Sequence, residues 1–218
     1  MFSAHCRQPL GGSWRSGAAG GELAESLSNA GFEIVAIDSN ADSIVIARAR
    51  GVDARIANWP DFPDTGFDAV LFTRSLHHVE RLQDSVDAAI GALAPGGRLI
   101  VEDFMAEGSP ERSQQWFRSF VTLLHRSGSL IRLTPFLEAA INGSHHHGHP
   151  GLHSSRDIAA ALRAVAHDAG TSHAAYFFRY LIPTHPELAA IALRHELGLI
   201  AANIIEPLGR RYVVDPSH

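Results

Sequence analysis

Short apolar runs alternate with amphipathic segments through the first half of the chain. Four runs have the length and β-branched content of buried strands: Glu33–Asp38, Val52–Ala57, Phe67–Phe72 and Arg98–Glu102. Three segments with a helical period or capping residues lie beside them: Glu22–Asn29, Ala41–Arg50 and Val79–Leu93. This alternation predicts a doubly wound α/β fold, a mostly parallel sheet with helices on both faces.

The second half of the chain is richer in helical pattern. We predict helices at Glu111–Arg126, Pro135–Asn142, Arg156–Ala169 and Pro186–Ile205, and strands at Ala174–Ile182 and Arg211–Val214. We therefore expect one domain over residues 1–218, with a core at 17–103, an added helical cover at 104–172 and C-terminal strands with a long helix at 173–218. The long apolar helix is expected either in the core or at the surface of a homodimer.

Residues 1–16 show no recognisable period and are predicted to be irregular. A strand of apolar residues should run directly into Gly17 in this type of fold, but the sequence there is GSWRS, residues 12–16. The first strand is therefore predicted to be degenerate or missing, with at best a stub at Ser13–Ser16. Such a gap would leave backbone groups of the neighbouring strands without ladder partners.

Composition excludes several classes of function. The chain has 218 residues, 45% hydrophobic and 19% charged, with a net charge of -5, which is typical of a globular protein and unsuited to holding a nucleic-acid backbone. All 18 cationic residues are arginine, so a Walker-type or Schiff-base lysine is excluded. Cys6 is the single cysteine, so an internal disulfide is excluded. No apolar run approaches the ~18 residues of a membrane span, and the N-terminus lacks the apolar core of a secretory signal. We expect a cytoplasmic protein without membrane contact.

A glycine-rich turn and an acidic residue delimit a candidate cofactor site. Gly17–Gly21 (GAAGG) opens directly into a helix, whose first N–H groups are unpaired and can meet an anionic group. Asp38 ends the next predicted strand, where a carboxylate can accept hydrogen bonds from two ribose hydroxyls. Both features belong to a nucleotide-cofactor site in a doubly wound sheet.

In this order and spacing, the chain resembles the class I S-adenosylmethionine-dependent methyltransferases, which have a Rossmann-like fold. The turn looks like the family's G-x-G-x-G with Ala19 at the middle glycine, and FDAVLFTRSLHHV and PGGRLIVEDF are similar to the family's fourth and fifth strands. The resemblance implies S-adenosylmethionine as cofactor and a set of cofactor-binding residues: Gly17, Ala19, Gly21, Asp38, Ser39, Asn58, Trp59 and Thr73. Within that set, Asp38 would hold the ribose, and Asn58 with Trp59 would meet the adenine.

The resemblance implies methyl transfer to a small-molecule acceptor. A sulfonium is an activated leaving group, so the protein mainly positions the reactants, and a base is needed only for a protonated acceptor. His78 and Asp103 follow the fourth and fifth strands and are the predicted catalytic residues, although His77 and His78 could instead cap or pack.

Two alternatives remain for the function. The altered first strand suggests a methyltransferase-like scaffold without turnover, and a nicotinamide oxidoreductase is less favoured because Ala19 and Glu22 stand where its fingerprint needs glycine. No metal is predicted at the site. The histidines between His145 and His153 form either a solvated loop, a lid on the acceptor side, or a metal site.

Overall fold

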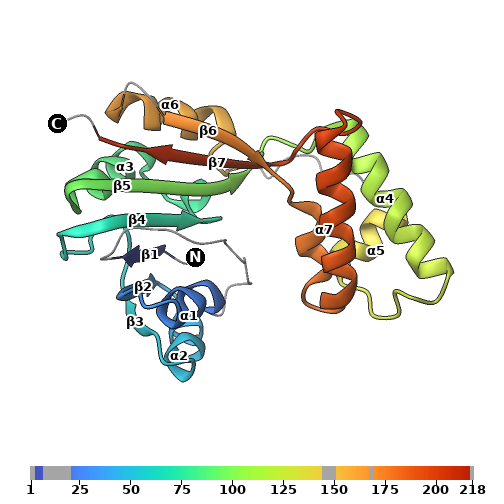
Figure 1. Ribbon diagram of the computed structural model, residues 1–218, viewed down its shortest axis with the longest axis horizontal. Helices are drawn as coiled ribbons and strands as arrows, with labels where there is room; N and C mark the ends of the chain where they lie inside the picture. The colour runs from blue at the N-terminus through green and yellow to red at the C-terminus, as the bar shows by residue number, and fades with distance from the viewer. Residues whose placement is uncertain (1–2, 7–20, 144–150, 167–168, 217–218) are drawn as a thin grey trace. The chain divides into compact units, whose positions relative to one another are not determined.

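The computed structural model describes residues 3–6, 21–143, 151–166 and 169–216 (Figure 1). The chain divides into two compact units. The sheet unit comprises Met1–Asp103, Leu152–Ser172 and Arg211–His218, and the helical unit comprises Phe104–Gly151 and His173–Arg210. The prediction of one domain over residues 1–218 stays a prediction.

One sheet runs through the sheet unit in the order β3-β2-β1-β4-β5-β7-β6. Its strands are β1 Ser3–Cys6, β2 Ile34–Asp38, β3 Asp53–Ile56, β4 Phe67–Thr73, β5 Leu93–Phe104, β6 Ala169–Ala174 and β7 Gly209–Val214. The pairs β2–β3 and β4–β5 are parallel, and the arrow of β7 runs against that of β5 (Figure 1). The predicted α/β fold with a mostly parallel sheet is confirmed.

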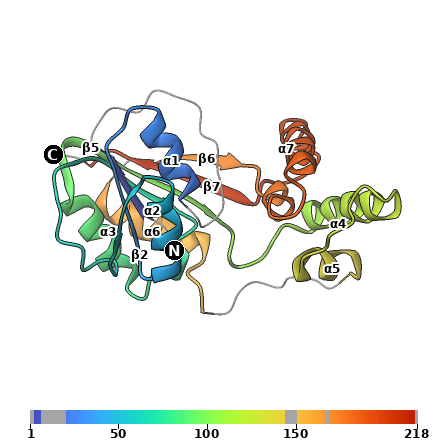
Figure 2. The same cartoon turned by 90° about the horizontal axis from the view of Figure 1, so that it is seen from below.

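Helices cover both faces of this sheet. They are α1 Glu22–Asn29, α2 Ala41–Ala49, α3 Leu82–Gly91, α6 Ser155–Val165 and the short 3₁₀ helix η1 Leu76–His78. Side chains of β4 alternate between the faces: Val70 and Phe72 pack with α3 and α6, whereas Ala69 and Leu71 pack with α1 and α2. In Figure 2, α1 lies above the strands and α3 below them.

The central strand β1 departs from the predicted pattern. Ser3–Cys6 forms a four-residue strand between β2 and β4 and pairs antiparallel with both. This corrects the prediction that all of residues 1–16 are irregular, because the backbone groups of β2 and β4 need ladder partners and four residues supply them. The strand is nevertheless short and runs against its neighbours. The predicted stub Ser13–Ser16 lies outside the described residues.

The helical unit is built around aromatic side chains. Its helices are α4 Glu111–Arg126, α5 Pro135–Ile141, the 3₁₀ helix η2 Phe177–Leu181 and α7 Pro186–Ala201. Phe117 of α4 stacks on Phe177 of η2, with ring centroids 4.9 Å apart. The long helix α7 buries Ala192 and Glu196 but leaves Leu197 48% exposed. It therefore contributes to a core, and the homodimer stays a prediction.

After residue 155, the helix predicted over Arg156–Ala169 is confirmed except for its C-terminal end, and the strand predicted over Ala174–Ile182 is wrong. The helix expected over Arg156–Ala169 ends at Val165, and Ala169 begins the edge strand β6. The aromatic run Ala174–Ile182, predicted as a strand, contains η2 instead. Its N–H groups at residues 176–178 converge on the Glu196 carboxylate, which favours a helical turn over an extended chain.

Among the helices of the described residues, none is both long enough and apolar enough to cross a membrane.

Candidate functional site

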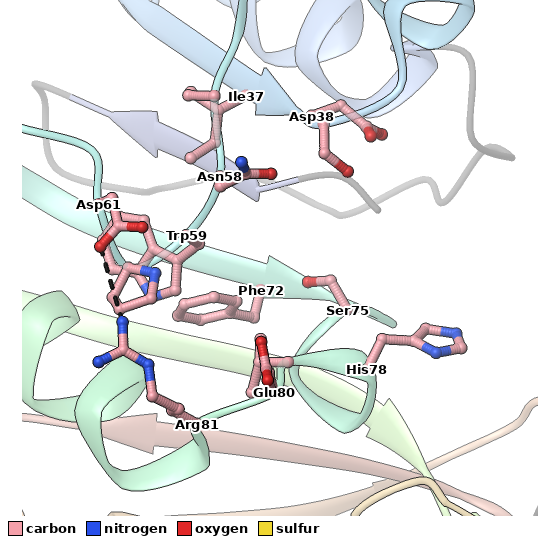
Figure 3. Close-up of a pocket in the computed structure, with 14 residues that line it drawn as sticks. Ile37, Asp38, Asn58, Trp59, Asp61, Phe72, Ser75, His78, Glu80 and Arg81 are labelled. Atoms are coloured by element: carbon pink, nitrogen blue, oxygen red, sulfur yellow. Dashed lines mark ion pairs between the residues drawn. The ribbon is translucent and has the colours of Figure 1, made fainter.

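A cavity of about 360 Å³ lies in the sheet unit at the carboxyl ends of β2, β3 and β4 (Figure 3). Ligands of doubly wound sheets bind at this edge. The lining residues come from the ends of the three strands and from the segments that follow them: Ile37, Asp38, Ser39, Ala57, Asn58, Trp59, Pro60, Asp61, Phe72, Ser75, His78, Val79, Glu80 and Arg81.

Asp38 enters the cavity from the end of β2 and is held in place by its own chain. The residue is 2% exposed, and its Oδ1 accepts a hydrogen bond of 2.8 Å from the backbone N–H of Asn40. The Asn40 side chain in turn accepts from Asp42 N–H and caps α2. The turn between β2 and α2 therefore fixes the carboxylate before any ligand arrives.

Trp59 forms a rigid wall on the side of β3. Its indole Nε1 donates to the Ser85 carbonyl at 2.9 Å, and its ring meets Phe72 edge to face with centroids 5.6 Å apart. The hydrogen bond and the ring contact fix the plane of the indole. Asn58, one residue earlier, also lines the cavity (Figure 3).

The charged lining of the cavity is mainly acidic. Asp38, Asp61 and Glu80 contribute carboxylates, and Arg81 contributes a guanidinium. Arg81 is 3.6 Å from Asp61, the ion pair drawn in Figure 3, and 3.0 Å from Asp84. Since two carboxylates already surround the guanidinium, the cavity favours a cationic ligand over an anionic one.

The histidines after β4 have different surroundings. His77 is 3% exposed, and the Asp103 carboxylate accepts its backbone N–H at 3.2 Å and lies 2.5 Å from its ring Nδ1. An ionised carboxylate only accepts, so Nδ1 then carries the proton. His78 is exposed, lines the cavity, and its ring centroid is 4.1 Å from that of His77. Asp103 therefore contacts His77, and His77 contacts His78.

His153 ties the end of the histidine-rich segment to the same loop. Its backbone N–H donates to His77 O at 3.0 Å, and its ring Nε2 lies 2.8 Å from Val79 O. The other four histidines of the segment fall in residues 144–150, outside the described part. Over the described residues, no cluster of three or more His, Cys, Asp or Glu side chains could hold a metal ion.

The structure brings together five of the predicted site residues at the cavity: Asp38, Ser39, Asn58, Trp59 and His78. Thr73 ends β4 half-buried, paired with Glu102 of β5, and does not line the cavity. Gly21 caps α1 with a positive φ of 87°. Asp103 reaches His77 and not the cavity. Gly17 and Ala19 lie outside the described residues.

Sequence reasoning overlooked Ser75, Glu80 and Arg81, which also line the cavity. Ser75 follows the end of β4 as His78 does, so its position in the sequence already indicates that this hydroxyl lies near the cavity. Nothing in the local pattern shows that Arg81, at the start of α3, reaches the loop after β3.

Comparison with known proteins gives one family match and several relatives. Residues 14–101 match the model of the family described as a methyltransferase domain, and this confirms the resemblance drawn from the motifs. The ubiquinone/menaquinone biosynthesis C-methyltransferase UbiE of Ectopseudomonas mendocina is 28% identical over 109 residues, 45% of this chain and 43% of that protein. The ubiquinone biosynthesis O-methyltransferase of Xylella fastidiosa is 37% identical over 94 residues, 39% of this chain and 38% of that protein.

The chain therefore spans about two fifths of the length of these curated relatives. Among solved structures, a SAM-dependent methyltransferase from Archaeoglobus fulgidus superposes with a TM-score of 0.52 and 13% identity, covering 89% of this chain and 81% of that one. At this identity the likeness concerns the fold alone.

Proposed function

We propose that this chain, whose residues 14–101 match the model of a methyltransferase-domain family, is a class I S-adenosylmethionine-dependent methyltransferase that transfers the methyl group of its cofactor to a small-molecule acceptor. The observation that carries the proposal is the acidic cavity at the carboxyl ends of β2, β3 and β4. The cofactor has a sulfonium cation and no phosphate, so acidic walls suit it. The same walls oppose the pyrophosphate of a nicotinamide cofactor.

The lining residues offer one partner for each part of the adenosyl group. The buried carboxylate of Asp38 is a charged acceptor for the two ribose hydroxyls. Asn58 offers an amide to the edge of the adenine, and Trp59 and Phe72 offer apolar ring surface. The cofactor itself supplies the activated methyl group.

His78 is the residue that we assign to the acceptor side of the reaction. Its exposed ring lines the cavity and contacts His77, so it can receive a proton from a protonated acceptor. Asp103 is a positioning residue in this scheme, because it is 1% exposed and acts on His78 only through His77.

The acceptor is proposed to be a small organic molecule. The net charge of -5 opposes a polynucleotide, and two relatives are named for methylation steps of ubiquinone or menaquinone biosynthesis. Small aromatic precursors of quinones, with a nucleophilic ring carbon or hydroxyl, are the class of acceptor to test first.

One observation favours a binding protein without turnover as the second candidate. The strand β1 ends at Cys6, opposite Ile34 and Ala69 at the amino ends of β2 and β4. It therefore ends at the edge of the sheet opposite the cavity, whereas the predicted pattern needs a strand that leads into Gly17 at the cavity edge.

Calorimetric titration with S-adenosylmethionine, S-adenosylhomocysteine and NAD⁺ tests the proposal, together with Asp38→Asn and the exposed carboxylate variant Asp68→Asn as control. Losing the charge at Asp38 weakens two charge-assisted hydrogen bonds, so we expect about 10- to 100-fold weaker binding, and no change for Asp68→Asn.

Transfer of a radiolabelled methyl group to phenolic and quinol acceptors then distinguishes an enzyme from a binding protein without turnover. No binding at millimolar cofactor would reject the proposal; binding without turnover on any acceptor would favour the scaffold.

A further inference from the structure

Ser75 presents a buried hydroxyl that no group of the described chain satisfies. The residue is 0% exposed, its Oγ has no hydrogen-bond partner among the described residues, and it lines the cavity. Figure 3 shows this oxygen pointing toward the space between Asp38, Asn58 and Phe72. Since buried polar atoms are nearly always hydrogen-bonded, an exception at a cavity wall calls for a partner inside the cavity.

The Ser75 hydroxyl also does not cap the helix that follows it, although its position would allow this. Ser75 directly precedes the 3₁₀ helix η1, where serine side chains commonly accept a hydrogen bond from the first turn. Here the side chain makes no capping hydrogen bond. The chain therefore directs the hydroxyl away from its own backbone.

The backbone on either side of Ser75 is firmly held. Arg74 has a φ of 55°, in the left-handed region that a non-glycine residue seldom adopts, and its N–H donates to Glu102 O at 2.7 Å. On the other side, His77 is held by Asp103. Such strain persists where surrounding contacts impose it, often at ligand sites. Ser75 is thus fixed in place facing the cavity.

We infer that the Ser75 hydroxyl is a specific contact for the adenosyl part of the bound cofactor; the inference rests on the proposed function. A hydroxyl both donates and accepts, which matches ribose hydroxyls and adenine nitrogens. The side chain faces Asp38 and Asn58, the residues assigned to ribose and adenine. A hydroxyl could also bond the carboxylate or ammonium of the cofactor's amino-acid part, so it is the place of Ser75 in the cavity with Asp38 and Asn58 that favours the adenosyl part.

The test compares Ser75→Ala with a control that removes another orphan hydroxyl. Thr184 Oγ1, in the helical unit, is likewise buried without a partner in the described chain, so Thr184→Val is the control. Binding of S-adenosylhomocysteine and of adenosine is measured by equilibrium dialysis, and thermal unfolding is followed without ligand.

For Ser75→Ala we expect about three- to tenfold weaker binding of both ligands, the loss of one neutral hydrogen bond. Its unfolding temperature without ligand should stay equal or rise, because the orphan hydroxyl is removed. Thr184→Val should bind both ligands like the parent protein. A purely structural serine would instead lower the unfolding temperature and leave the affinity of the folded protein unchanged.

Unchanged affinity for both ligands would overturn the inference while the parent protein still binds cofactor. Weaker binding of S-adenosylhomocysteine with unchanged binding of adenosine would overturn the assignment to the adenosyl part. If the parent protein binds neither ligand, the proposed function itself fails, and the inference fails with it.

Discussion

Replacement of Glu196 tests how much one buried carboxylate contributes to the stability of the helical unit. Glu196 lies on α7 and is 1% exposed. Its Oε1 accepts from the backbone N–H groups of Tyr176 at 2.7 Å and Phe177 at 3.1 Å, and its Oε2 accepts from Phe178 at 3.1 Å. One side chain thus satisfies the three N–H groups at the start of η2.

The size of the effect follows from those three bonds. Glu196→Ala leaves three buried donors without an acceptor, at about 1–2 kcal/mol each, or about 3–6 kcal/mol together. The variant also recovers part of the cost of burying a carboxylate, which offsets about 1–2 kcal/mol of that loss. We expect a net decrease of about 3 kcal/mol in the free energy of unfolding, a large part of a typical 5–15 kcal/mol.

The same carboxylate predicts a dependence on pH. Burial raises the pKa of Glu196, and the three N–H groups and Arg179 oppose that shift. A pKa higher in the folded than in the unfolded state means that the folded state binds the proton more tightly. This contribution is complete below the unfolded pKa near 4.5 and is lost as pH rises through the folded pKa.

Urea unfolding between pH 4 and about pH 8 measures both effects, with Glu196→Gln as the neutral isostere and the exposed Glu187→Gln as control. The stability of the parent protein relative to Glu196→Gln should fall as pH rises above about 4.5, whereas the Glu187 variant should follow the parent. The reasoning would be refuted if Glu196→Ala lowered the free energy of unfolding by less than about 0.5 kcal/mol. It would also be refuted if the difference in that free energy between the parent protein and Glu196→Gln did not depend on pH.

Two further substitutions test the sheet unit. Asp103→Asn replaces a carboxylate, both of whose oxygens face His77, with an amide. We expect the free energy of unfolding in urea to fall by about 1–3 kcal/mol and methyl transfer to be about tenfold slower, with an unchanged dissociation constant for the cofactor. A change in that dissociation constant alone would contradict the positioning role. Gly21→Ala should lower the unfolding temperature more than Gly51→Ala: both glycines have positive φ, but a Cβ at Gly21 would lie 2.9 Å from Ala47 Cβ, and nothing lies within 4 Å at Gly51. Equal losses for the two variants would show that the contact with Ala47 is unimportant.

The local elements could be predicted from the sequence where their signals are themselves local. The predicted bounds of α1 and α4 agree with the structure, because the glycines that follow the two helices, Gly31 and Gly128, and the apolar period act within a few residues. The order of strands and helices likewise implied which residues follow the carboxyl ends of strands. Asp38, Asn58 and His78 were therefore selected from sequence and lie at one cavity.

Elements that depend on distant partners could not be predicted in this way. The aromatic run around Phe177 has strand propensity, but Glu196, about 20 residues later, accepts its successive N–H groups and stabilises a 3₁₀ turn. Ser3–Cys6 lacks any strand signal, yet β2 and β4 supply a ladder on both sides. In both cases the partner lies elsewhere in the chain.

By itself, then, the sequence determined the α/β class, the resemblance to the methyltransferase family and the strand ends that line the cavity, since these follow from periodicity and from motif spacing. Only the tertiary structure decided that Asp103 faces His77 across 26 residues, that Arg81 reaches Asp61, and that the Ser75 hydroxyl is buried at the cavity. Burial and hydrogen-bond partnership are properties of the packed chain, because they depend on which distant groups exclude water from a side chain.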